Sequence, residues 1–145
     1  MNIWQFENAV SQRLLRWGLV SVVVGLVMRL GSPFWKGVGS QFVGWGAVDA
    51  AIALFGFIGM RNRVDKLDNP GVAEVKRKEE RNLGRALWIN AILDVFYILG
   101  GFLWMRRDKG DGQARGVGWG VVIQGAFLLI FDVLHAQNMP KTDKD

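Results

Sequence analysis

The charged residues of this chain are separated from four long apolar stretches, and this separation limits the fold more than any other feature of the sequence. The stretches cover residues 14–30, 37–60, 86–105 and 116–136, and only five of the 18 basic and 13 acidic residues fall inside them. A helix that crosses a bilayer needs about 20 apolar residues, whereas a soluble helix repeats charged residues along one face. The sequence therefore predicts an all-α, polytopic membrane protein whose four transmembrane helices form a single domain over residues 1–145.

Two segments outside these stretches are also predicted to be helical. Residues 1–13 place four apolar side chains among polar ones, a pattern typical of a short helix in the membrane interface. Residues 61–85 mix positive and negative charges and are predicted to be a helical loop on the cytoplasmic side, with a helix starting at Asn69-Pro70. A signal peptide is the alternative for the first apolar stretch, although no A-x-A-like cleavage site follows it.

The basic residues favour one orientation in the membrane. Twelve of the 18 Lys and Arg lie in or next to the N-terminal segment, the 61–85 loop and the C-terminal segment, and six lie in or next to the two short loops. Loops rich in Lys and Arg stay in the cytoplasm, which predicts a multi-pass protein of the cell inner membrane with both termini cytoplasmic. Trp17 and Trp88 stand at the starts of their stretches, where indole rings favour the headgroup level.

A short internal match indicates a duplication. The motif V-G-W-G occurs at residues 43–46 and again at 117–120, in the second and fourth stretches. It predicts a tandem repeat of two helical hairpins, and chance recurrence in Gly-rich apolar sequence is the alternative. Small residues four apart allow close helix contact in lipid, so we expect the second and fourth helices to pack closely. The residues of these pairs are Ser40, Gly44, Gly46, Ala50, Gly116 and Gly120.

Polar side chains inside the apolar stretches are the candidate functional residues, because ionisable groups are costly in lipid. Asn90, Asp94 and Tyr97 are spaced to share one face of a helix. Asp49 and Gln124 lie near the middle of the second and fourth stretches. We expect these five residues to form one intramembrane polar network. It is either a proton or cation relay, or a set of hydrogen bonds that fixes helix pairing.

Metal and enzyme chemistry find little support in the sequence. Asp132 and His135 lie one turn apart and are predicted to be a hydrogen-bonded pair at the membrane interface. The chain has one His and no Cys, so we expect no metal site and no cofactor. We find no nucleophile-base pair and expect no enzymatic activity. The basic 61–85 loop is interrupted by Glu79 and Glu80, which favours the lipid bilayer over nucleic acid as its partner.

Two segments carry a family resemblance. WINAILDVFYILGG in the third stretch and GVGWGVVIQGAFLLIFDVLH in the fourth resemble an uncharacterised family of small bacterial four-helix membrane proteins. The resemblance covers mainly residues 84–136 and implies a four-helix fold in a bacterial inner membrane, without an activity. The positions that match are Asn90, Asp94, Tyr97, Gln124 and Asp132.

Two functions are consistent with these patterns. The first is a structural or accessory membrane protein that assembles as a homo-oligomer or as a small subunit of a membrane complex, because close-packing residues are abundant. The alternative is a small proton-coupled transporter or channel that uses the intramembrane carboxylates. They differ in whether Asp49, Asp94 and Gln124 line an open polar cavity or are packed shut.

Overall fold

Four long helices make up most of the chain, and each is long and apolar enough to cross a membrane. The computed structural model describes residues 1–142, so the last three residues of the predicted cytoplasmic C-terminus lie outside the described residues. The prediction of an all-α protein with four membrane-length helices is confirmed. The helices are α1 (Ile3–Met28), α2 (Pro33–Asp65), α3 (Ala73–Met105) and α4 (Gln113–Gln137).

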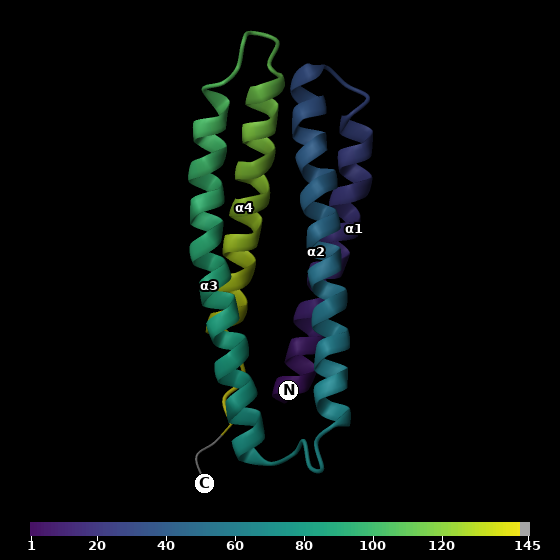
Figure 1. Ribbon diagram of the computed structural model, residues 1–145, viewed down its shortest axis with the longest axis vertical. Coiled ribbons are helices and arrows are strands. Elements are labelled where there is room, and N and C mark those ends of the chain that lie inside the picture. Colours follow the sequence, from purple (N-terminus) through teal and green to yellow (C-terminus); the bar gives the residue numbers. More distant parts are fainter. Residues whose placement is uncertain (143–145) are drawn as a thin grey trace.

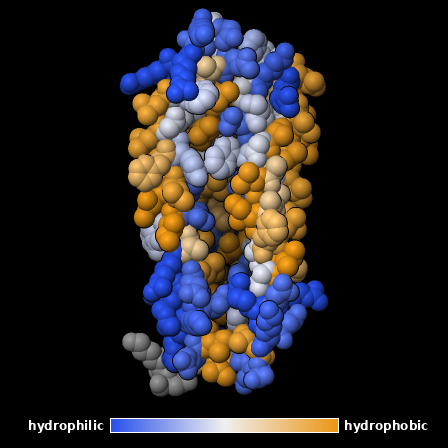
Figure 2. Space-filling view, viewed as in Figure 1, coloured by the Kyte–Doolittle hydropathy of each residue, from blue (hydrophilic) through white to orange (hydrophobic). Residues whose placement is uncertain are grey.

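The helices form two antiparallel hairpins that stand next to each other, α1 with α2 and α3 with α4 (Figure 1). Both hairpin loops lie at one end of the molecule, which we call the loop end. The N-terminus, the α2–α3 connection and the C-terminal end of α4 lie at the other end, which we call the terminal end. Hydrophobic residues cover the middle of the visible face and hydrophilic residues gather at both ends (Figure 2), as expected for a protein whose middle lies in lipid.

The helix ends follow from local sequence. Asn2 caps α1 by accepting a hydrogen bond from the Gln5 backbone N–H, and the Gln5 side chain completes the capping box. Gly112 precedes α4 with φ of 84°, a conformation that favours glycine. Helix α3 begins at Ala73 and not at the predicted Asn69-Pro70, because the Asn69 side chain accepts from Gly71 N–H and holds a turn instead.

The predicted interfacial segment is continuous with the first membrane-length helix, α1. Residues 3–13 form the opening turns of α1 and do not make a separate helix. Their apolar side chains Ile3, Phe6 and Val10 are buried in a cluster with Phe131 of α4. The apolar face that suggested a lipid surface thus packs against another helix at the terminal end.

Glycines set the helix packing, and they do so mainly within each hairpin. A Cβ placed on Gly46 of α2 would lie 2.6 Å from the Gly18 carbonyl oxygen of α1, and one on Gly101 of α3 would lie 2.8 Å from the Gly118 carbonyl oxygen of α4. Contacts are most extensive between α1 and α2 and between α3 and α4, with α2 and α4 next. The second and fourth helices do pack closely, as predicted, but the contacts within each hairpin are more extensive.

The predicted small residues nevertheless serve helix contact within the chain. Ala50 lies with Gly46 against Gly18, whereas Gly120 packs on Gln41 of α2. A Cβ on Gly116 would clash with the Phe34 backbone of α2. The remaining two residues behave differently: Ser40 donates to the Gly37 carbonyl of its own helix, and Gly44 has no heavy atom within 4 Å of its Cβ position.

Helices α2 and α3 pack little against each other. Among residues 1–142 they are not one of the helix pairs in extensive contact. They form the face turned toward the viewer in Figure 1, and the same face is hollowed between the hairpins in Figure 2. This hollow leads to the polar side chains described below.

Candidate functional site

Three aspartates from three helices converge on one cavity of about 150 Å³. They are Asp49 of α2, Asp94 of α3 and Asp132 of α4, and we call them the carboxyl cluster. Only 2%, 3% and 6% of their respective surfaces are exposed. The carboxyl groups of Asp94 and Asp132 are within hydrogen-bond distance, and Asp49 lies close enough to both for their charges to interact.

The glycine seam between α3 and α4 brings Asp94 and Asp132 together. Gly118, Gly125 and Asp132 recur every seven residues, so they share one face of α4. Gly118 faces Gly101 of α3, and Gly125 faces the Asp94 backbone. Side chains lean toward the N-terminus of their own helix, and α3 and α4 are antiparallel, so the two aspartates lean toward each other.

Among residues 1–142, no salt bridge joins a cation to the carboxyl cluster. Asp49 Oδ2 and Asp94 Oδ2 are buried and have no hydrogen-bond partner in this part of the chain. The salt bridges of the described residues involve other carboxylates and none of these three. Two carboxylates at hydrogen-bond distance repel each other, and a proton held between them relieves that repulsion. The geometry is suited to binding and releasing protons.

The cavity has a buried floor and an exposed rim. The carboxyl cluster lies at the floor, together with Leu14 of α1 and Leu128 of α4, so all four helices contribute. Asn90 and Tyr97 of α3 are exposed and lie at the rim. The rim also includes exposed apolar side chains of α2 and α3, whose common face we call the open face: Val48, Ile52 and Leu93.

Gln124 does not join this cavity, in contrast to the predicted network. Its side chain is fully buried, accepts from Trp17 Nε1 at 3.0 Å and donates to Ser21 Oγ at 3.3 Å. Gln124 and Asp132 are eight residues apart, which rotates them by about 80° around α4. Gln124 therefore faces α1, whereas Asp132 faces α3. Trp17, predicted as a headgroup anchor, is this hydrogen-bond donor and stacks on Phe127.

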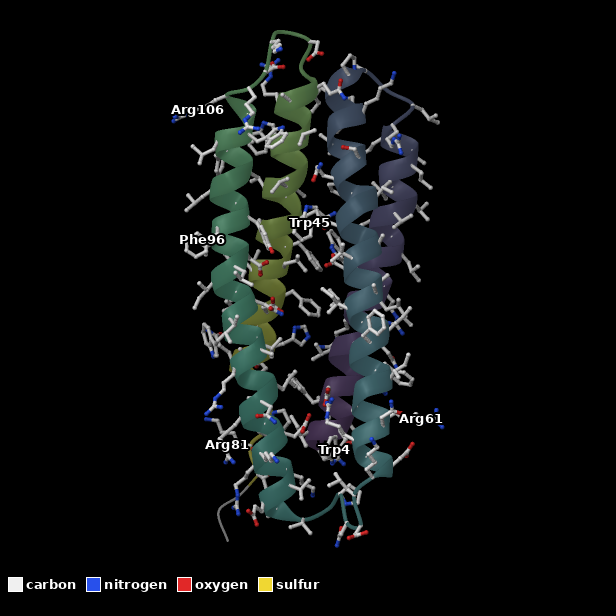
Figure 3. The ribbon with its side chains drawn as sticks, in the orientation of Figure 1. Trp4, Trp45, Arg61, Arg81, Phe96 and Arg106 are labelled. Carbon is white, nitrogen blue, oxygen red and sulfur yellow. The ribbon has the colours of Figure 1, made fainter. Side chains whose placement is uncertain are left out.

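An aromatic pair lines the cavity of the carboxyl cluster, which we call the carboxyl cavity, and one of its two rings also lines a larger cavity toward the loop end. Trp45 is one turn from Asp49 and Tyr97 is about one turn from Asp94, and their ring centroids are 4.8 Å apart. Trp45 points from α2 into the space between the hairpins (Figure 3). Tyr97 also lines the second cavity, of about 360 Å³, which we call the outer cavity. Its other lining residues are Gln41, Phe96, Gly100, Gly101, Trp104, Val117 and Val121.

One family model matches residues 13–133, a range that includes the whole carboxyl cluster. It describes a family of unknown function, DUF6992. The chain belongs to this family. The predicted resemblance to an uncharacterised family is thereby confirmed. A comparison with curated proteins and one with solved structures found no match.

In this DUF6992 protein Asp132 and His135 are not the pair that the sequence predicted. His135 Nδ1 lies 2.6 Å from the Phe131 carbonyl oxygen, and Nε2 lies 3.0 Å from Arg13 Nη1 of α1. Asp132 turns instead to Asp94. Among the described residues, no group of three or more His, Cys, Asp or Glu has the arrangement of a metal site.

A second polar cluster, missed by sequence reasoning, joins the hairpins of the DUF6992 protein at the terminal end. Arg63 Nη2 of α2 lies 2.6 Å from Glu7 Oε1 of α1 and 2.7 Å from Glu79 Oε1 of α3. We call these three residues the ion-pair cluster. The sequence gives one indication of this cluster: Glu7 lies on the same helix face as Ile3, Phe6 and Val10. A carboxylate buried on an apolar face needs a charged or hydrogen-bonding partner.

Proposed function

We propose that this DUF6992 protein is a small proton-coupled membrane transporter in which the carboxyl cluster is the proton-binding site. The observation that carries this proposal is a cavity with three buried carboxyl groups, two of which have an oxygen without a partner. At 1.5 Å per residue, Asp49 lies about 24 Å along α2 from Pro33, and Asp94 lies about 16 Å from the end of α3 at Met105. Both depths fall inside a hydrocarbon core of about 30 Å.

The contrast with Gln124 favours transport over a purely structural role. A structural polar residue in a helical bundle satisfies its hydrogen bonds, as Gln124 does with Trp17 and Ser21. Asp49 and Asp94 keep a buried oxygen unsatisfied next to a cavity. Unsatisfied buried groups are costly, and they are retained where a ligand or proton binds.

The groups around the carboxyl cluster support proton binding. Asp49 of α2, Asp94 of α3 and Asp132 of α4 face one another, and His135 lies one turn from Asp132. From α1, Arg13 contacts His135. Three carboxyl groups without a salt bridge favour a protonated cluster in acid, and they favour proton release when the surroundings become alkaline.

Reconstituted vesicles test the proposal. With a pH-sensitive dye inside and a membrane potential imposed, we expect wild-type vesicles to take up protons faster than vesicles with Asp49→Asn or Asp94→Asn. Asp65→Asn is the matched control, because this exposed aspartate lies at the end of α2 outside the cavity. Equal proton flux in wild type, Asp49→Asn and Asp94→Asn would contradict a proton-coupled function.

We further propose that both termini are cytoplasmic, in the inner membrane. The proposal is supported by the excess of Lys and Arg in the segments at the terminal end. The opening turns of α1 would then lie at the level of the cytoplasmic interface. We also propose that the two hairpins arose by a tandem duplication, because the motif V-G-W-G occurs in both α2 and α4. Impermeant thiol labelling of Asp68→Cys and Ser32→Cys tests the orientation, because the chain contains no Cys.

A second candidate is an accessory role in a homo-oligomer or a larger membrane complex. It is favoured by Gly44, which is exposed on α2 with open space around its Cβ position. Close-packing glycines that find no partner within the chain are suited to a partner in the membrane. Light scattering in mild detergent tests this: wild type should be larger than a monomer, and Gly44→Leu should be monomeric. A monomeric wild type would contradict this role.

A further inference from the structure

We infer that the carboxyl cavity and the outer cavity form one binding site for an organic cation with an apolar body. This inference rests on the proposed function, since it names the substrate class of the same site. The two cavities share Tyr97 and have volumes of about 150 Å³ and about 360 Å³. Together they fall in the range of about 300 to 1,000 Å³ that small-molecule sites occupy.

The charge of the site selects a cation. Asp49 and Asp94 are more than nine-tenths buried and line the carboxyl cavity. Each keeps one oxygen without a hydrogen-bond partner among the described residues. A cationic head placed among them would supply the positive charge that the described residues do not. The cavity does not have the ligand arrangement of a metal site, which favours a larger, weakly hydrated cation over a metal ion.

The aromatic pair suits the same ligand. Trp45 and Tyr97 lie beside the carboxyl cluster from opposite sides of the open face, with their ring planes inclined by 59°. Indole and phenol rings attract a cation over their faces, and the attraction grows when the cation is desolvated. Trp45 lines the carboxyl cavity and Tyr97 lines both cavities, so a ligand that occupies both contacts Tyr97 and has Trp45 beside its cationic head.

The outer cavity provides room for the apolar body. It is lined mainly by aromatic and aliphatic side chains, and Gly100 leaves open space with no heavy atom within 4 Å of its Cβ position. Gln41 supplies the polar side chain from α2. Apolar walls with a few polar groups are typical of small-molecule sites.

The open face provides a route of entry from lipid. Val48 and Ile52 of α2 and Leu93 of α3 are about half exposed at the cavity rim. An organic cation with an apolar body partitions into the membrane and can reach this rim between α2 and α3. The protons of the carboxyl cluster and the cation would then compete for the same oxygens.

Binding of tetraphenylphosphonium tests the inference, with tetraphenylborate as an anion of the same shape. By equilibrium dialysis of detergent-solubilised protein against empty micelles, we expect saturable binding of the phosphonium and no saturable binding of the borate. Asp94→Asn and Asp49→Asn should weaken phosphonium binding about tenfold or more, as expected when a charged partner is lost. Asp65→Asn should bind like wild type.

Two further variants keep the test decisive if an Asn variant fails to fold. Asp94→Glu retains the charge and should retain binding, whereas Trp45→Leu removes the indole face and should weaken binding several-fold. Equal saturable binding of both ions, or wild-type affinity in the Asn variants and in Trp45→Leu, would overturn the inference. Failure to bind the phosphonium, with Asp-dependent proton flux in vesicles, would reject the cation alone and leave the proposed function intact.

Discussion

Two kinds of buried polar residue occur inside the apolar part of this protein. Gln124 has no exposed surface and bonds Trp17 and Ser21 across the bundle. Asp94 is buried almost as deeply but keeps an unsatisfied oxygen next to a cavity. The hydrogen bonds of Gln124 hold α4 to α1, whereas the unsatisfied oxygen of Asp94 is available to bind a proton or a ligand. Mutation of each residue should therefore affect different properties.

Removing the Gln124 amide should lower stability. In Gln124→Leu the indole N–H of Trp17 and the hydroxyl of Ser21 lose their partner, and a lost partner of this kind costs about 1 to 3 kcal/mol. Thermal unfolding in detergent, followed by circular dichroism, measures the effect. Gln41→Leu is the matched control, since Gln41 is only partly buried and lines the outer cavity. An equal loss in both variants would contradict the structural role of Gln124.

The sequence identifies most of the site residues but not their grouping. The spacing of Asn90, Asp94 and Tyr97 was enough to place them on one face, and the structure brings them to one cavity with Asp49. Asp132 was assigned to His135 because the two are one turn apart. The partner of Asp132 in the structure is Asp94 of α3. In the sequence, only the seven-residue spacing of Asp132 from Gly125 and Gly118 indicated that Asp132 lies on the face of α4 that packs against α3. Contacts between helices depend on rotation about their axes, which spacing within one helix does not determine.

At the scale of the element, glycines decide which helix faces meet. Gly100 and Gly101 are adjacent in α3, yet only Gly101 touches α4, where it meets Gly118. The sequence predicted close packing from small residues four apart and placed it between the second and fourth helices. The structure uses glycines chiefly inside each hairpin, because consecutive helices joined by short loops are already held side by side.

This adjacent pair of glycines gives a direct test of the α3–α4 contact. Gly101→Ala puts a methyl group about where the Gly118 backbone lies, so we expect a clear fall in the unfolding temperature. Gly100→Ala adds a methyl group in open space and removes backbone freedom, so stability should be unchanged or slightly higher. Equal effects of the two substitutions in the same thermal assay would show that α3 and α4 do not pack as described.

At the scale of the whole molecule, the hairpins are joined differently at their two ends. Toward the loop end, α2 and α4 pack through Gly116 and Gly120. At the terminal end, Arg63 bridges α1 and α3 through Glu7 and Glu79. Between these ends α2 and α3 leave the open face that leads to the carboxyl cluster. The buried cluster of Ile3, Phe6 and Val10 with Phe131 also joins the two hairpins at the terminal end.

Loss of the Arg63 bridge should widen the terminal end. Because the chain has no Cys, spin labels attach only at introduced cysteines, and Arg61 and Arg81 extend outward there from α2 and α3 (Figure 3). In the Arg61→Cys/Arg81→Cys background, Arg63→Gln should lengthen and broaden the distance distribution measured by pulsed electron resonance. Lys66→Gln should not change it. An unchanged distribution in Arg63→Gln would mean that the ion-pair cluster does not hold the hairpins together.

In the proposed function, the carboxyl cluster holds a proton that exchanges with water. Infrared difference spectroscopy of the protein in lipid nanodiscs, stepped from alkaline to acidic pH, detects buried carboxyl groups by the stretching band of the protonated form. We expect a band in wild type and in Asp65→Asn that weakens or shifts in Asp49→Asn, Asp94→Asn and Asp132→Asn. A wild-type spectrum without a pH-dependent buried carboxyl band, or with a band that all three substitutions leave unchanged, would show that the carboxyl cluster does not bind an exchangeable proton.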